Sequence, residues 1–206
     1  MINVKKIYDK LGKTAAIEWI KKICSVKRKS NNLKLNLYHL DFSNVDLSEA
    51  NLSEANLFEA NLYRTDLSRT DLSEANLSGA NLSETDLTEA NLSRANLSEA
   101  YLIKANLFKA NLTEAYLSRA DLTEAILYRA YLNDKTDTII DIKQISRLGS
   151  RNSELIIFKC TKSIIVCTGC FYDTLDKFEE AVKKEHKEYT KHYKEYMAAI
   201  TFIKSL

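Results

Sequence analysis

The sequence contains no proline and only four glycines among its 206 residues. Most protein turns use these two residue types, because glycine adopts positive φ freely and proline fixes φ. A chain with many turns and this composition needs corners that accept Asn, Ser and Glu. No apolar stretch approaches the roughly 20 residues that span a bilayer, and Met1–Ile7 has no apolar run behind its lysines. We therefore expect neither a membrane-spanning segment nor a signal peptide.

Cysteine and histidine are scarce as well. The four cysteines do not form the pattern of a secreted disulfide framework, so we predict a reducing, cytoplasmic setting. The three histidines are not accompanied by any Ser-His-Asp grouping, which argues against hydrolytic chemistry. The prediction is that the chain is not an enzyme.

A zinc site is the one metal centre that these residues suggest. Cys160, Cys167 and Cys170 include a Cys-x2-Cys step, and His186 or His192 would complete the ligand set. The first two cysteines fall on predicted strands, however, and a fourth ligand at a fixed spacing is missing. Buried free thiols are the favoured interpretation, and no metal or cofactor is expected.

Residues 35–134 are dominated by a repeat of five residues. From Leu37 to Leu132 every fifth residue is leucine, with Phe42 as the exception. Two positions earlier stands a small residue, alanine or threonine from Ala50 onward, and Asn or Asp usually lies between. Neither a helix nor a flat strand keeps every fifth side chain on one face. A chain that runs three residues extended and then turns a corner does.

The predicted structure is therefore a coil with the leucine and the small residue inside. The Asn or Asp and the two residues after leucine point outward. Interior positions are represented by Leu52, Leu57, Leu62, Leu72, Leu92 and Leu112.

The charges indicate how many sides close the coil. In a four-sided coil, residues twenty apart stack at about 4.8 Å, where opposite charges stabilise and like charges destabilise. Among the second residues after leucine, nine such pairs are opposite and three are alike, namely 54/74, 109/129 and 114/134. A three-sided coil, with a spacing of fifteen, gives seven opposite and six alike. The charges favour four sides.

The repeat resembles the pentapeptide-repeat family, whose motif is A(D/N)LXX. Ala75-Asn76-Leu77-Ser78-Gly79 and Ala90-Asn91-Leu92-Ser93-Arg94 match it closely. The resemblance covers about half of the chain in twenty uninterrupted copies. It implies a mainly β protein, a right-handed quadrilateral β-helix of about five coils, roughly 24 Å long at the strand spacing.

Residues 1–34 are predicted to form an N-terminal helical cap and a basic linker. Apolar residues at helical spacing indicate one or two short helices broken near Gly12; these residues are Ile7, Leu11, Ala16, Ile17, Ile20, Ile23 and Cys24. The cap would cover the unpaired edge of the first coil. Large residues occupy the small interior position there, at Leu35, Leu40 and Val45.

Two short motifs in this region have plain interpretations. Gly12-Lys13-Thr14 lacks the glycine five positions earlier that a phosphate-binding loop needs. Lys27-Arg28-Lys29 is interpreted as a solvated linker, and no direct contact with nucleic acid is expected.

Residues 135–206 are predicted to form a small α+β cap. A strand over Thr138–Leu148 is followed by a hairpin of Leu155–Lys159 and Ile164–Cys167. Thr174 is the expected N-cap of the first of two helices. Gly149-Ser150-Arg151 and Thr168-Gly169-Cys170-Phe171 resemble a tail found in some bacterial and phage pentapeptide-repeat proteins.

Charge is distributed unevenly along the chain. Residues 41–99 hold twelve acidic and three basic side chains, although the whole chain has a formal net charge of +2. The candidate acidic surface comprises Asp46, Glu49, Glu54, Glu59, Asp66, Asp71 and Glu74. Some members of the family imitate the shape and charge of a DNA duplex, bind DNA gyrase and protect it against quinolones. The resemblance implies such a DNA mimic, acting on gyrase or another type II topoisomerase, as an alternative function.

Aromatic and aliphatic residues interrupt the outward pattern over the last coils. The candidate apolar contact patch comprises Tyr101, Ile103, Phe108, Tyr116, Ile126, Tyr128 and Tyr131. Phe108 and Tyr128 are twenty apart, so a four-sided coil stacks them in one column, with Ile126 two residues along. Outward apolar residues usually contact something, and three occupants remain open: the C-terminal cap, a second copy in a homodimer, or another protein. The leading hypothesis for function is a non-enzymatic interaction or scaffold protein with an unidentified partner.

Overall fold

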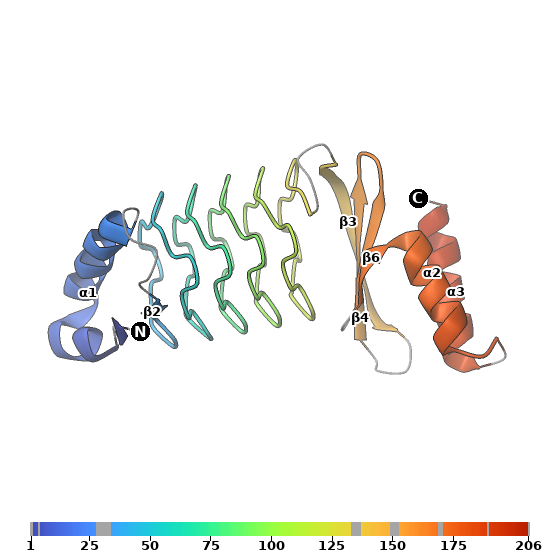
Figure 1. The fold of residues 1–206 in the computed structure, drawn as a ribbon, viewed down its shortest axis with the longest axis horizontal. Helices are drawn as coiled ribbons and strands as arrows, with labels where there is room; N and C mark the ends of the chain where they lie inside the picture. Colours follow the sequence, from blue (N-terminus) through green and yellow to red (C-terminus); the bar gives the residue numbers. More distant parts are fainter. Residues whose placement is uncertain are drawn as a thin grey trace.

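The computed structural model describes residues 2–3, 5–27, 34–132, 137–148, 153–168, 171–188 and 190–205. A coiled rod lies between an N-terminal helix, α1 (Lys5–Lys27), and a C-terminal sheet with two helices behind it (Figure 1). The chain passes along the long axis from one end to the other. No helix within the described ranges is both long and apolar enough to cross a membrane.

The rod is a β-helical solenoid in which each coil has four sides. Parallel β-bridges join residues twenty positions apart, from Asn36–Asn56 to Asn111–Tyr131. Between coils, leucine N–H groups donate to carbonyls nineteen residues later, as from Leu57 to Asn76 at 2.7 Å. The predicted solenoid is thus confirmed, and the spacing of twenty inferred from the charges is the observed one.

We number the sides by the leucine or phenylalanine of the first coil. Side 1 begins with Leu37, side 2 with Phe42, side 3 with Leu47 and side 4 with Leu52, and each continues in steps of twenty. The charged residue two positions after each leucine belongs to the ladder of that side. The side-3 ladder, for example, is Glu49, Arg69, Glu89, Lys109 and Arg129.

Each corner is a turn closed by a hydrogen bond such as Ala55 N–H to the Leu52 carbonyl, 3.0 Å. Its third residue has positive φ in every pentad from His39 to Arg129, as in a type II turn, where glycine is usual. Only Gly79 is a glycine there. A non-glycine residue at such a φ costs about 1–2 kcal/mol. The rod accepts this strain at its corners, and most of the residues there carry a charge.

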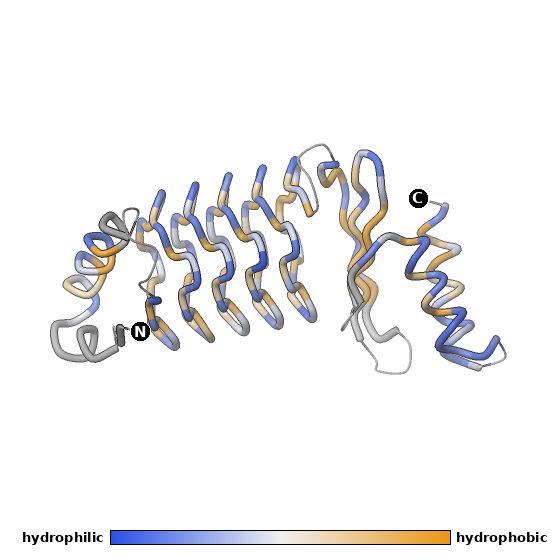
Figure 2. Tube along the Cα trace, in the orientation of Figure 1, coloured by the Kyte–Doolittle hydropathy of each residue, from blue (hydrophilic) through white to orange (hydrophobic). Residues whose placement is uncertain are grey.

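The interior of the rod is a column of leucine and alanine. Leu52, Leu57, Leu62, Leu72 and Leu92 are fully buried, and Leu112 is nearly so. Figure 2 shows hydrophobic residues recurring in every coil and along the strands of the C-terminal sheet.

Three threonines occupy the small interior position. Their hydroxyl groups donate to carbonyls of the preceding coil at 2.7–3.0 Å; the donors are Thr65, Thr70 and Thr85. No buried side-chain nitrogen or oxygen within the described residues lacks a hydrogen-bond partner. The polar atoms inside the rod therefore carry no desolvation penalty from missing hydrogen bonds.

The N-terminal end of the rod is covered by α1, which is interrupted at Gly12. That glycine has φ 83° and ψ 170°, which only glycine adopts without strain. Ile17 and Ile20 pack against the rod core. A pairing that the sequence did not predict joins β1 (Ile2–Asn3) in parallel to β2 (Leu35–Asn36), so the edge of the first coil gains a strand. The side chains of Ile7, Leu11 and Cys24, and the linker residues Arg28 and Lys29, lie outside the described parts.

The C-terminal region is a four-stranded antiparallel sheet followed by two helices. The strands are β3 (Ile139–Leu148), β4 (Ser153–Cys160), β5 (Ile164–Thr168) and β6 (Phe171–Thr174), hydrogen-bonded in that order. The three predicted strands correspond to β3, β4 and β5, and the fourth strand, β6, was not predicted. β6 has only four residues and runs directly into a helix, which is too short for an alternating pattern to identify.

The sheet separates two cores because alternate residues of a strand face opposite sides. Ile156, Phe158 and Ile165 pack with the core of the rod. Leu155, Ile157 and Val166 pack instead against α2 (Leu175–Glu185) and α3 (Lys191–Lys204). Thr174 is the N-cap of α2, as predicted, but its side chain makes no capping hydrogen bond. The predicted turn at 149–152 and Cys170 lie outside the described residues.

Backbone hydrogen bonds join the last coil to the sheet. The Ile139 N–H donates to the Ala130 carbonyl at 2.8 Å, and the Arg129 N–H donates to the Ile139 carbonyl at 3.3 Å. Tyr131 forms an antiparallel bridge to Thr138. The exposed edge of the last coil is thereby paired by β3 along this side.

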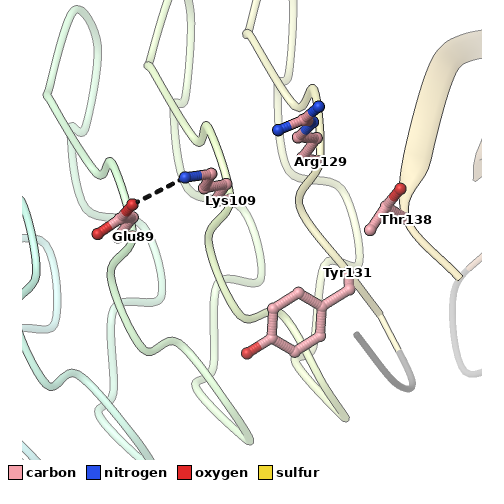
Figure 3. Close-up of a pocket in the computed structure, with 5 residues that line it drawn as sticks. All are labelled: Glu89, Lys109, Arg129, Tyr131 and Thr138. Carbon is pink, nitrogen blue, oxygen red and sulfur yellow. Dashed lines mark hydrogen bonds and ion pairs between the residues drawn. The ribbon is translucent and has the colours of Figure 1, made fainter. Parts of the chain in front are cut away.

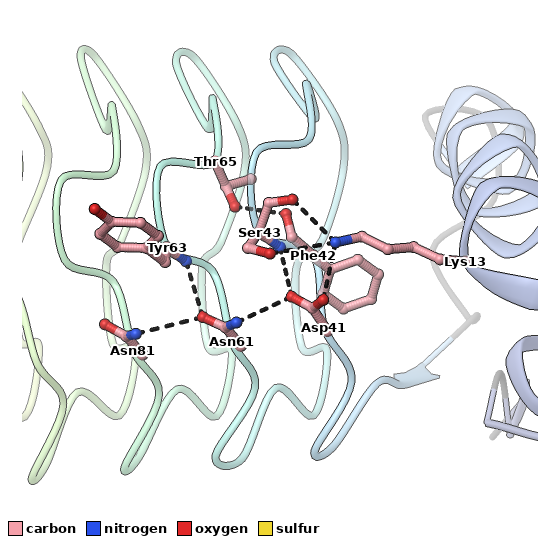
Figure 4. A network of polar contacts seen from close by, with 8 residues as sticks. All are labelled: Lys13, Asp41, Phe42, Ser43, Asn61, Tyr63, Thr65 and Asn81. Atoms are coloured by element: carbon pink, nitrogen blue, oxygen red, sulfur yellow. Dashed lines mark hydrogen bonds and ion pairs between the residues drawn. The ribbon is translucent and has the colours of Figure 1, made fainter.

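Lys13 of α1 fixes the helix to side 2 of the rod (Figure 4). Its ammonium group donates to the Asp41 carboxylate at 2.9 Å, to the Ser43 carbonyl at 3.0 Å and to the Ser43 hydroxyl at 3.2 Å. Asp41 also accepts from the Asn61 amide at 3.0 Å, and Asn61 accepts from Asn81 at 3.3 Å. A row of outward amides therefore ends at a cation supplied by the helix.

Replacing Lys13 with methionine should lower the free energy of unfolding by at most about 1 kcal/mol at pH 7, since both side chains are partly exposed. Partial burial on its own would raise the pKa of Asp41, but hydrogen bonds from Ser43 and Lys13 together lower it below 3.8. A carboxyl with a lowered folded-state pKa stabilises the protein above its unfolded pKa, and this contribution disappears as pH falls through the folded pKa.

The difference between wild type and Lys13→Met should therefore vanish at acidic pH. Urea unfolding between pH 7 and pH 3 measures it. Lys21→Met is the matched control, because Lys21 reaches Asp46 only at 3.9 Å and its loss should cost less. A difference that persists unchanged at pH 3 would show that the Asp41 contact is not responsible.

Candidate interaction surfaces

The outward Asn and Asp residues are used by the rod itself. Their side-chain oxygens accept the backbone N–H two residues later, as from Ser53 to Asn51 at 3.1 Å. Their amides also bond along the sides, as from Asn56 to Asn36 at 3.0 Å and from Asn111 to Asn91 at 2.9 Å. These rows stabilise the turns and the stacking of coils.

The charged ladders pair between coils. Eight of the nine opposite pairs predicted from the sequence form ion pairs: 49/69, 64/84, 69/89, 74/94, 89/109, 94/114, 99/119 and 104/124. The hydrogen bond from Arg64 lowers the pKa of Glu84. Exposed pairs of this kind contribute below about 1 kcal/mol each to the free energy of unfolding. Their main effect is to fix the positions of the outward side chains.

Most of the candidate acidic surface is neutralised in this way. Glu49, Glu54, Glu59 and Glu74 each lie beside a cationic or ionisable side chain: Arg69, Lys34, His39 and Arg94 respectively. Asp71 accepts the amide of Asn91 on side 4. Asp46 and Asp66 stack with Asp86 in one column of side 3, and Asp46 also lies 3.9 Å from Lys21 of α1.

The candidate apolar residues do not form one patch. Their sequence offsets of five, ten and fifteen are not multiples of twenty, so a four-sided coil divides them among its sides. Tyr116 lies on side 1, Tyr101 and Ile103 on side 2, and Tyr131 on side 4. Side 3 holds the remaining three, Phe108, Ile126 and Tyr128. The column of Phe108 and Tyr128 with Ile126 is the one that the spacing of twenty predicts, and the other four residues of the candidate patch do not join it.

We call Phe108, Ile126 and Tyr128 the aromatic cluster. The rings of Phe108 and Tyr128 stack with centroids 6.2 Å apart and planes 24° apart. Ile126 is 52% exposed and Tyr128 is 54% exposed. The C-terminal sheet therefore leaves this cluster open to solvent, as it leaves Tyr101 and Tyr116.

Cations border the aromatic cluster. The Lys109 ammonium lies 5.1 Å from the centroid of the Phe108 ring, and the Arg129 guanidinium lies 5.5 Å from that of Tyr128. Cation–π contacts at exposed positions are worth roughly 0.5–1 kcal/mol. This end of side 3 is therefore apolar and positively charged together.

The candidate zinc ligands are not assembled within the described residues. Cys160 and Cys167 are buried free thiols, and burial raises the pKa of both to about 11. His186 stacks on Tyr196 with ring centroids 5.4 Å apart, and His192 lies 3.3 Å from Glu195. No three His, Cys, Asp or Glu side chains in the described ranges are placed to hold a metal ion.

A cavity that sequence reasoning did not identify lies where the side-3 ladder meets the sheet. It has a volume of about 410 Å³ and is lined by Glu89, Lys109, Arg129, Tyr131 and Thr138 (Figure 3). The signal in the sequence was the like-charged pair 109/129. Its significance depends on the position of Thr138, which only the fold reveals.

A family model for pentapeptide repeats matches residues 36–73, 70–107 and 100–134, with eight copies. Residues 36–134 of this chain belong to the pentapeptide-repeat family. No curated protein matches the chain. Among solved structures, a pentapeptide-repeat protein from the thylakoid lumen of Arabidopsis thaliana is 28% identical, with a TM-score of 0.35, over 50% of this chain and 71% of that one.

Two further solved structures are similar to part of the chain. HetL from Nostoc sp. PCC 7120, described as involved in the regulation of heterocyst differentiation, is 34% identical with a TM-score of 0.26, over 50% of this chain and 57% of that one. QnrB1, a plasmid-mediated fluoroquinolone resistance protein, is 19% identical with a TM-score of 0.27, over 48% of this chain and 56% of that one. These similarities do not transfer a function to this chain.

Proposed function

We propose that this pentapeptide-repeat protein is a non-enzymatic interaction protein, a rod that presents fixed side chains to a protein partner. The observation that carries the proposal is the aromatic cluster, in which Ile126 and Tyr128 are exposed on side 3 and the half-buried Phe108 ring stacks on Tyr128. Exposed apolar groups of this kind mark contact surfaces. The ladder of the same side is internally paired from Glu49 to Lys109, which leaves this cluster and Arg129 as the distinctive features of its side.

The rod suits recognition because its surface is rigid. Every coil is bonded to the next through backbone N–H groups and through side chains, so the outward residues hold fixed spacings. Little conformational entropy is then lost when a partner binds. The buried free thiols of Cys160 and Cys167 support a reducing, cytoplasmic setting for this activity.

The test compares wild type with Phe108→Ala/Tyr128→Ala in a pull-down from the native host. Phe58→Ala/Tyr63→Ala is the matched control, because it removes two outward aromatic residues from sides 1 and 2. We expect a specific protein to be captured by wild type and the control but lost by the first variant. Sedimentation of all three shows whether that partner is a second copy. Equal capture by all three proteins would overturn the proposal.

A second candidate is a DNA mimic that acts on gyrase or another type II topoisomerase. The column of Asp46, Asp66 and Asp86 supports it, because carboxylates repeat at coil spacing with no base between them on that column. A supercoiling assay with and without a quinolone tests it, using Asp46→Asn/Asp66→Asn/Asp86→Asn as the variant. Unchanged gyrase activity at micromolar wild-type protein removes this candidate.

A further inference from the structure

The side-3 ladder alternates in charge until its last step. Arg69 lies 3.2 Å from Glu49 and 3.8 Å from Glu89, and Lys109 lies 3.2 Å from Glu89. The next residue in the column is Arg129, another cation. Three cations and two carboxylates therefore share this column, which leaves one positive charge without a counterpart.

Among the described residues Arg129 has no counterion, because the rod ends at this coil. In a longer rod a further coil would supply the next member of the ladder. Here the start of β3 takes that place, where Ile139 accepts the Arg129 N–H and the neutral Thr138 pairs with Tyr131. Within the described part of the chain, the Arg129 guanidinium forms no ion pair, and it lies 5.5 Å from the centroid of the Tyr128 ring. The other ladder arginines each pair with a glutamate; they are Arg64, Arg69, Arg94 and Arg119.

The vacant ladder position coincides with the cavity of about 410 Å³. Liquid water occupies about 30 Å³ per molecule, so the cavity has room for a carboxylate and part of its side chain. Arg129 supplies a cation beside the Lys109–Glu89 ion pair, and Thr138 and Tyr131 complete the lining (Figure 3). Burial raises the pKa of Tyr131, so its hydroxyl remains protonated at neutral pH.

We propose that this cavity is a carboxylate-binding site, in which an acidic side chain of a peptide partner takes the ladder position beyond Arg129. A guanidinium binds a carboxylate through two parallel hydrogen bonds, which favours this ligand over a neutral amide. The aromatic cluster lies beside the same cations, so the preferred peptide carries an apolar residue next to its acidic one. The inference rests on the proposed function and specifies the chemistry of the partner.

The direct test is a titration of ¹⁵N-labelled full-length protein followed by NMR. The probe is the peptide Ac-Phe-Glu-Glu-Leu-NH₂, and Ac-Phe-Gln-Gln-Leu-NH₂ is its neutral analogue. We expect saturable shifts of the Arg129 side-chain Nε–H and the Thr138 amide with the acidic peptide, and at least fivefold weaker binding of the neutral one. Inorganic phosphate is titrated as a third ligand, and saturation by phosphate alone would identify a site for free anions.

Three variants separate a specific carboxylate site from general charge attraction. Arg129→Gln should weaken binding of the acidic peptide at least fivefold, whereas Arg119→Gln, which removes an exposed arginine from side 1, should change it less than twofold. Thr138→Glu places a carboxylate in the cavity from the sheet, and it should both raise Tm and reduce binding at least fivefold.

Several results would overturn the site: no saturable shift at Arg129, equal binding of the two peptides, equal losses in both arginine variants, or saturation by phosphate alone. None of these depends on the pull-down. If the wild type captures a partner through the aromatic cluster while the titration fails, the interaction function stands and the carboxylate site does not.

Discussion

Truncating Leu92 to alanine should lower the free energy of unfolding by about 2–5 kcal/mol, the range for deleting a fully buried leucine. Leu92 is 0% exposed in the middle of the rod, on side 4 between Leu72 and Leu112. Backbone hydrogen bonds fix the distance between coils, so the neighbouring leucines cannot move together to fill the space. The cavity left by the truncation therefore remains, and the packing contacts of the leucine side chain are not replaced.

Urea unfolding followed by circular dichroism measures this effect. Ile126→Ala is the control, since Ile126 is 52% exposed and its truncation should cost within about 0.5 kcal/mol. A loss below about 1 kcal/mol for Leu92→Ala would contradict a close-packed leucine column.

Phe158→Ala should have an effect at least as large, about 3–5 kcal/mol, because a buried phenylalanine leaves a large cavity. Phe158 of β4 is 0% exposed and packs with the core of the rod across the junction with the sheet. Its removal weakens the contact that covers the last coil. We therefore expect the local loss of stability to be largest in the last coil of the rod and in the sheet.

Hydrogen exchange measured by mass spectrometry locates that damage. Exchange should accelerate over residues 117–132 and 153–168 and change little over residues 52–72. Phe202→Ala is the matched control, because Phe202 of α3 is 50% exposed. A uniform acceleration along the whole rod would contradict a local effect on the last coil and the sheet.

The architecture of the rod could be predicted because its repeat is strict. The position of each leucine follows from the period of five, and the four-sided closure follows from pairs such as Glu89 and Lys109. The division of the apolar residues could also have been predicted, since Tyr101 and Tyr116 are fifteen apart and cannot share a side of a four-sided coil.

The ends of the rod could not be predicted to the same depth. The pairing of Ile2–Asn3 with Leu35–Asn36 joins segments whose local sequences carry no signal for each other. β6 is defined by its hydrogen bonds to β5 and not by its own short pattern. The cavity at Arg129 exists because β3 begins beside the last coil, and nothing in the repeat specifies where the following strand will lie.

A pair of disulfide cross-links tests the four-sided stacking most directly. In a background with all native cysteines replaced by serine, Ser78→Cys/Ser98→Cys places two thiols on successive coils of side 1, and Ser78→Cys/Ser93→Cys places them on different sides. Strand neighbours at about 4.8 Å lie within the Cα separation of about 4.4–6.8 Å that disulfides require. Mild oxidation should cross-link the first pair nearly completely and leave the second reduced, as read by the mass of thiol-alkylated protein. Efficient cross-linking at a spacing of fifteen, with none at twenty, would contradict the four-sided coil.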